Sequence, residues 1–363
     1  MQTPLLTLVT IVFLLPIFVN AQSNEEKAMQ LGNEAIELMD NGKIAQGLTL
    51  LEEAKKLDPS RSIYSYEIAY GNYAAGNYKK AIKILEDILD APDGSDLYYQ
   101  LLGNAYDNDG NGKKATKVYE AGLAKYPNSG KLYLESGIQQ LGFKEYNTAL
   151  TLFEKGIDVE PDFPSNYYWA AKLFLGASEE EVWGMIYGEL FMNLERNSKR
   201  TAEISKMIYD TYKSEIQLTS DTSMSVSFSK DATIEISDAT DLANIKLPYG
   251  VSVYEPTLTI ALLSEQQVTP ASLDRIRSRF IDIYFQQEHH VKYPNALFNY
   301  VKTVKDAGHL EAYNHWILMK GDATDFELWR QANDGKWKAF IEWFGENRLV
   351  ITQSNKFVRS QYR

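Results

Sequence analysis

Histidine is the side chain that most often acts as an acid, a base or a metal ligand near neutral pH, and the chain contains four. His289 and His290 are adjacent, whereas His309 and His315 lie six residues apart. Two histidines that bind one metal from a single helix are expected three or four residues apart, so neither pair has the required spacing. A metal would require the two pairs to converge in the fold. We therefore predict no metal site and no cofactor.

The segment 107–112, Asp-Asn-Asp-Gly-Asn-Gly, places oxygen-bearing side chains at alternate positions around a glycine. This pattern is similar to the opening of a calcium-binding loop, which must also end on a bidentate glutamate at its twelfth position. That position is Val118, which has no oxygen ligand to offer. We therefore interpret 107–112 as a turn between two helices.

Motifs of the common catalytic mechanisms are absent from the sequence. It contains no G-x-S-x-G, no Walker loop, no H-E-x-x-H and no dinucleotide-binding glycine pattern. The absence of cysteine excludes disulfides, thiolate nucleophiles and zinc–cysteine sites. We therefore predict that the protein is not an enzyme.

An alternative function is suggested by tryptophans that lie close to carboxylates in the sequence. Four of the six tryptophans lie between positions 316 and 343. Aromatic residues at helical spacing usually belong to a core, but an exposed set stacks against sugars or peptides. The alternative function is therefore an enzyme or a carbohydrate-binding module in this region. Its residues would be Trp316, Trp329 and Trp337 with Asp322, Asp325, Glu327 and Glu342.

The charge balance narrows the choice of partners. The chain has 37 basic and 49 acidic residues, which gives a net charge of −12. Nucleic-acid binding depends on basic surface, and anionic membranes attract the same kind of surface. We therefore predict no nucleic-acid partner.

The first residues have the pattern of an export signal. Residues 4–19 are almost entirely apolar, and Val-Asn-Ala at 19–21 has the small-x-small pattern that precedes signal cleavage. The run of 16 is short for a membrane span, which needs about 20 residues. No basic residue precedes the run, so an uncleaved anchor is the alternative. We expect a signal peptide over 1–21 and a periplasmic or extracellular mature chain without stable membrane insertion.

A regular period runs through the first half of the chain. Small residues recur at equal intervals at Gly47, Ala81, Ala115 and Ala149, and prolines at Pro59, Pro127 and Pro161 fit the same interval. Small side chains suit positions where two helices cross closely, and proline ends a helix because it has no N–H to donate. The pattern predicts helix–turn–helix units with aromatic residues such as Tyr119 and Phe153 beside the crossings.

This pattern resembles the tetratricopeptide repeat (TPR), a helix–turn–helix unit of about 34 residues. Its copies fall at 28–61, 62–95, 96–129 and 130–163, and a degenerate fifth copy falls at 164–197. The resemblance implies a mainly α-helical fold, in which a TPR-type α-solenoid of four to five repeats occupies residues 22–200. Arrays of this kind present extended concave surfaces for binding.

The resemblance also implies where a partner would bind. In TPR arrays the first helices of successive repeats line a concave groove. The corresponding residues here are Tyr66, Tyr70, Tyr73, Gln100, Asn104, Asn108, Lys131, Tyr168 and Lys172. The three tyrosines are spaced i, i+4 and i+7, so they share one helix face. Tyrosine gives a large contact area with few rotatable bonds. The alternative is that the C-terminal domain fills the groove.

Residues 201–363 have a different pattern. Alternating polar and apolar residues predict a small β-hairpin near 223–237, with strands around 224–228 and 234–236. Amphipathic stretches predict helices at 272–287, 295–307, 310–320, 324–333 and 336–345. We expect a mostly helical domain here, ending in a basic tail after Arg348 that is frayed or strand-like.

These observations together predict an exported scaffold or adaptor. Its function would be to hold a protein or peptide partner in the groove of the repeat array, and the sequence does not specify its oligomeric state.

Overall fold

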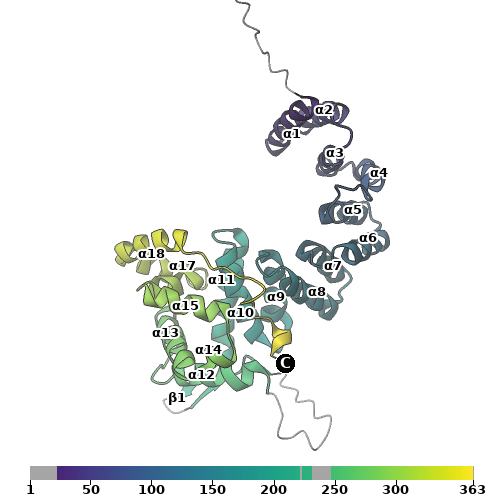
Figure 1. The fold of residues 1–363 in the computed structure, drawn as a ribbon. Coiled ribbons are helices and arrows are strands. Elements are labelled where there is room, and N and C mark those ends of the chain that lie inside the picture. Colours follow the sequence, from purple (N-terminus) through teal and green to yellow (C-terminus); the bar gives the residue numbers. More distant parts are fainter. Residues whose placement is uncertain (1–22, 221–222, 231–246, 363) are drawn as a thin grey trace, which may run out of the picture. The chain divides into compact units, whose positions relative to one another are not determined.

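The computed structural model describes residues 23–220, 223–230 and 247–362. The chain divides between Leu101 and Leu102 into two compact units, which are described separately. Figure 1 gives the labels of the helices and strands. The predicted signal peptide over 1–21 lies outside the described residues. The predicted fold class is confirmed: helix–turn–helix pairs are followed by a mostly helical region with one small two-stranded sheet among the described residues.

The first unit contains two complete helix pairs and the beginning of a third. The helices are α1 (Asn24–Asp40), α2 (Ile44–Leu57), α3 (Ile63–Ala74), α4 (Tyr78–Ile88) and α5 (Asp96–Asn108), of which α5 continues past Leu101. Its core is formed where α1, α2 and α3 meet, around Leu51, Tyr64 and Ile68. Ser23 and Glu26 form a capping box at the start of α1, which satisfies N–H groups that have no partner within the helix.

The second unit continues the repeats. Its pairs use α6 (Gly112–Lys125), α7 (Gly130–Gly142), α8 (Tyr146–Val159), α9 (Pro164–Ala177) and α10 (Glu181–Leu194). The first helices α5, α7 and α9 begin at positions 96, 130 and 164, which are equally spaced. The period predicted from the sequence is therefore observed in the structure.

Two glycines let the helices of a pair cross closely. A Cβ atom placed on Gly103 would lie 2.1 Å from Cε1 of Tyr119. The same contact recurs one period later, where a Cβ on Gly137 would lie 2.4 Å from Cε1 of Phe153. Real Cβ atoms do not come this close to another heavy atom, so glycine is required beside each aromatic ring.

The turn within each pair contains one residue in the left-handed conformation. Gly42, Gly76 and Gly110 have φ between 77° and 82°, and they lie one period apart. The next position on this period is Lys144, with φ of 63°. Glycine adopts this conformation at no steric cost, whereas a residue with a Cβ atom is destabilised in it. The segment 107–112 is the predicted turn, with Asn111 capping α6.

The rest of the second unit begins with α11 (Lys199–Glu215), which leads into strand β1 (Ile216–Ser220) and strand β2 (Ser223–Val226). The two strands pair antiparallel, with Ile216 opposite Val226. The partner of β2 is thus a strand upstream of it, which the sequence analysis did not predict. The predicted second strand at 234–236 lies outside the described residues.

The C-terminal helices agree with the predicted ones. After a π-helical turn (Gly250–Tyr254) come α12 (Glu255–Ala261), α13 (Pro270–Gln286), α14 (His289–Lys292), α15 (Ala296–Asp306), α16 (Leu310–Ile317), α17 (Ala323–Ala332), α18 (Asp334–Glu346) and a 3₁₀ turn (Arg359–Gln361). A single hydrophobic core extends from Leu134 to Val358. Residues on both sides of position 200 therefore share one core, and the domain boundary placed there stays a prediction.

The basic tail is packed and not frayed. Phe357 and Val358 are buried. Lys356 donates to the backbone oxygen of Asp158 at 2.7 Å, and Arg359 forms an ion pair with Glu154 at 2.5 Å. The prediction of a frayed or strand-like tail was wrong because Lys356 and Arg359 pair with Asp158 and Glu154 of α8.

Replacing Lys144 with glycine should stabilise the second unit. Because φ at this position is 63°, we expect a gain of about 0.5–1 kcal/mol in the free energy of unfolding. All six tryptophans lie beyond position 102, so tryptophan fluorescence during urea unfolding measures this unit. Lys144→Ala is the matched control, because it removes the side chain without relieving the backbone. An equal gain in both variants would contradict this explanation.

Candidate functional site

The three predicted groove tyrosines of α3 differ in exposure. Tyr70 is 43% exposed. Tyr66 is half-buried, and its ring stacks on Tyr98 with centroids 5.0 Å apart. Tyr73 is half-buried, with its ring 5.5 Å from that of Tyr78. Tyr70 is therefore the tyrosine of this set with the most surface available to a partner.

Other apolar residues of the first unit share this exposure. Ile36 precedes Tyr70 by one repeat period, and Met29 precedes Ile63 by the same distance. All four are exposed: Met29 51%, Ile36 38%, Ile63 37% and Tyr70 43%. Because α1 and α3 are the first helices of neighbouring repeats and contact each other, equivalent positions lie on the same face. We call these four residues the apolar row. The sequence analysis missed three of them, although their periodic spacing was visible.

A cleft of about 420 Å³ adjoins the apolar row at Ile63. Its other walls include Pro92, Tyr98 and Asp93. The carboxylate of Asp93 accepts hydrogen bonds from the backbone N–H and the hydroxyl of Ser62. These hydrogen bonds hold the pKa of Asp93 below its usual value. The carboxylate therefore stabilises the start of α3 and is not free for catalysis.

The predicted polar residues of the third repeat are largely held within it. Asn104 accepts a hydrogen bond of 2.5 Å from the hydroxyl of Tyr119. Asn108 is exposed but donates to the backbone oxygen of Asn104. Gln100, in the first unit, is half-buried.

Helix α11 packs over the predicted site residues of the fifth repeat. Tyr168 is buried, and its hydroxyl donates to Glu203 at 2.5 Å. Lys172 forms an ion pair with Glu203 at 2.8 Å. In the fourth repeat, Lys131 lies 3.8 Å from Glu160. Tyr168 and Lys172 are therefore both engaged by Glu203 of α11, and their place in a binding groove stays a prediction.

The tryptophans of the alternative function are mainly packed. Trp316 is fully buried. The indole N–H of Trp329 donates to Glu311 at 3.0 Å, and its ring stacks on His315 at 4.1 Å. Trp337 is half-buried and packs edge-on against the ring of Trp329. Two of the nearby carboxylates stabilise α17, since Asp322 caps the helix and Glu327 forms an ion pair with Arg330. Asp325 lies on α17 and Glu342 lies on α18.

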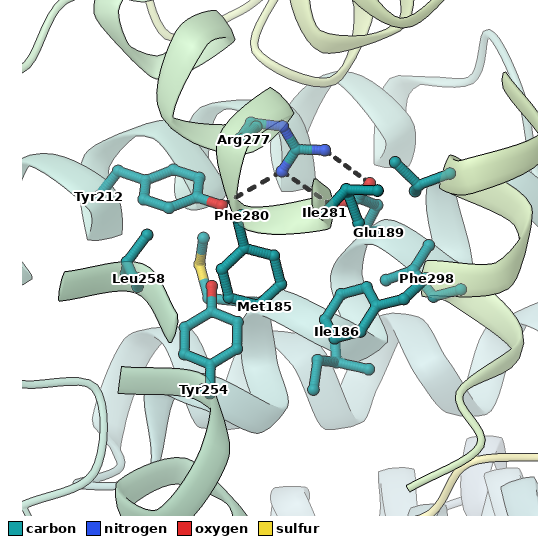
Figure 2. Close-up of a pocket in the computed structure, with 12 residues that line it drawn as sticks. Met185, Ile186, Glu189, Tyr212, Tyr254, Leu258, Arg277, Phe280, Ile281 and Phe298 are labelled. Carbon is teal, nitrogen blue, oxygen red and sulfur yellow. Dashed lines mark hydrogen bonds and ion pairs between the residues drawn. The ribbon is translucent and has the colours of Figure 1, made fainter. Parts of the chain in front are cut away.

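A buried ion pair lies beside a small interior cavity (Figure 2). Arg277 of α13 forms two hydrogen bonds with Glu189 of α10, at 2.6 and 3.0 Å. Tyr313 donates to the same carboxylate at 2.9 Å, and Arg277 donates to Asn314 at 2.8 Å and to Tyr212 at 3.2 Å. The cavity is about 30 Å³ and otherwise mostly apolar, which accommodates one or two waters and not a substrate.

A larger cleft of about 500 Å³ lies between the start of α8 and the end of α9. The exposed ring of Tyr146 and the carboxylates of Glu179 and Glu180 line it. Arg359 also lines it, but its guanidinium is paired with Glu154 and Glu180. The cleft therefore has a polar surface, but the guanidinium of Arg359 is not available to bind an anion there.

Within the described residues, no group of three or more histidine, cysteine or acidic side chains could hold a metal ion. Nor does any helix in the described ranges have the length and apolar character to cross a membrane.

Removing Arg277 should strongly destabilise the second unit. In the Arg277→Met variant, Glu189 would remain buried without its cation, so we expect a loss of about 3–5 kcal/mol in the free energy of unfolding. Urea unfolding followed by tryptophan fluorescence measures this loss. The double variant Arg277→Met/Glu189→Met is the control, and it should recover much of the stability because no unpaired charge remains. An unchanged midpoint in the single variant would show that the pair contributes little.

Comparisons with known proteins find helical repeat proteins among the solved structures. No protein-family model and no curated protein matches the chain. The thermophilic TPR protein TTC0263 of Thermus thermophilus is 16% identical, with a TM-score of 0.42 over 50% of this chain and 98% of that one. Pseudomonas aeruginosa PilF is 17% identical, with a TM-score of 0.44 over 52% and 86%. YrrB, described as a TPR protein with an unusual peptide-binding site, is 18% identical, with a TM-score of 0.34 over 49% and 91%.

Proposed function

We propose that the protein is a scaffold or adaptor that binds a protein or peptide partner on the first helices of its repeats. The observation that carries this proposal is the apolar row, in which equivalent positions of α1 and α3 expose large apolar side chains. Exposed apolar residues that gather on one face, and are not scattered singly, mark interaction sites.

Tyr70 is the central anchor in this proposal. It is the exposed aromatic residue of the apolar row, and aromatic residues dominate the binding energy of protein interfaces. Tyr66 and Tyr73 support the surface from their half-buried positions. Asn104, Asn108 and Lys131 belong to the second unit, and their place in a binding groove stays a prediction, as does that of Gln100. Tyr168 and Lys172 are left out because Glu203 engages both.

We further propose that the chain acts outside the cytoplasm, after export by a signal peptide over residues 1–21. Intact-mass measurement of the chain recovered from the envelope and the medium tests this. We expect a mature protein that begins at Gln22, and a mass that retains Met1 would instead indicate an uncleaved anchor.

Replacing Tyr70 with alanine should separate binding from folding. Because the side chain is 43% exposed, we expect the free energy of unfolding to change by no more than about 0.5 kcal/mol, measured by circular dichroism. Partner capture should weaken by about 2 kcal/mol if Tyr70 is a central anchor. Crosslinking and pulldown with the mature chain measure the capture.

Tyr64→Ala is the matched comparison for stability. Tyr64 lies on the same helix but is buried, so its replacement should cost about 3–5 kcal/mol. A comparable loss in the Tyr70→Ala variant would show that Tyr70 is covered within the protein, and the proposal of an open binding face would fail.

A further inference from the structure

The apolar row of the first unit is accompanied by uncompensated negative charge. Helix α1 carries five acidic residues and α3 carries one, against a single basic residue, Lys27. Lys27 is already paired with Glu53 of α2 at 3.2 Å. Not all of these carboxylates share the face of the apolar row, but Asp40, eleven residues after Met29, and Glu67, four residues after Ile63, do.

Two of these carboxylates lie where the repeats meet. Asp40 is at the end of α1, and Glu67 is on α3 one turn before Tyr70. Glu67 is half-buried, and among the described residues neither carboxylate has a hydrogen bond or an ion pair. Burial and the negative charge of Asp40 raise the pKa of Glu67. The repulsion between the two groups would be relieved by a cation placed between them.

The arginine of the adjoining cleft is close to a different carboxylate. Arg61, which lines the adjoining cleft, lies close enough to Asp93 to lower the pKa of that carboxyl group. Tyr66 stacks on Tyr98 beside Glu67 and contributes no positive charge. The face thus combines apolar anchors with an acidic position that is left open.

We propose that the apolar row binds a peptide segment in which a lysine or arginine stands between apolar residues. This inference rests on the proposed function and adds the chemistry of the partner. The apolar side chains pack against Ile36, Ile63 and Tyr70, and the cation forms a charge-assisted hydrogen bond with Glu67. A half-buried carboxylate favours a cation more than an exposed one does, because it is less screened by solvent.

Selection from a random twelve-residue peptide library against the mature chain tests this proposal. We expect the enriched peptides to contain a basic residue flanked by apolar residues. Synthetic copies, measured by fluorescence polarisation, should bind about tenfold more weakly to Glu67→Gln, since a charge-assisted hydrogen bond contributes about 1.5 kcal/mol or more. Raising the salt concentration should weaken binding as well.

Glu52→Gln is the matched control, because Glu52 is exposed on α2 and the variant makes the same change of charge away from the apolar row. This inference would be overturned if the enriched peptides lacked a basic residue, or if they bound Glu67→Gln as tightly as the native chain. The proposed function would still hold in that case if binding depended on Tyr70. If the Tyr70→Ala variant bound the peptides as tightly as the native chain, or if no peptide were enriched, both the inference and the proposed function would be overturned. A dimer in sedimentation that dissociates on Tyr70→Ala would show that a second copy covers the face, which also overturns the inference.

Discussion

The ion pair between Glu189 and Arg277 is the constraint around which the second unit is organised. Both side chains are buried, and removing two charges from water is costly unless each has excellent partners. Tyr212 and Asn314 complete the hydrogen bonds of the guanidinium, so helices α10, α11, α13 and α16 must all be in place for the pair to be satisfied. The fifth repeat is consequently part of a larger core and does not end the array as an independent cap.

Side chains at the same repeat position can be exposed in one repeat and engaged in internal contacts in another, depending on the elements that pack beside them. Tyr70 and Lys172 are separated by three repeat periods. Tyr70 is exposed in the first unit, whereas Lys172 is paired with Glu203 of α11. The repeat period therefore identifies equivalent positions, but the neighbouring elements decide whether a side chain at such a position remains exposed.

Local patterns made the repeats and most helices predictable. Gly103 and Tyr119, and again Gly137 and Phe153, recur at the spacing that close helix crossing requires. The sequence did not reveal the pair of Glu189 and Arg277, because 88 residues separate them and neither has a local signature. The pairing of β1 was missed for a related reason, since Ile216 continues directly from α11 and carries no turn signal before it.

The contact between Arg359 and Glu154 has a consequence for the order in which the chain folds. The two residues are 205 positions apart, and Arg359 also pairs with Glu180. The helices α1 to α4 make their contacts with near neighbours, so they can fold as soon as they emerge during synthesis. The fourth repeat, in contrast, keeps Glu154 without its cation until Arg359 has been made. Synthesis of the chain therefore leaves this surface of α8 incomplete until the segment between Glu154 and Arg359 has been made.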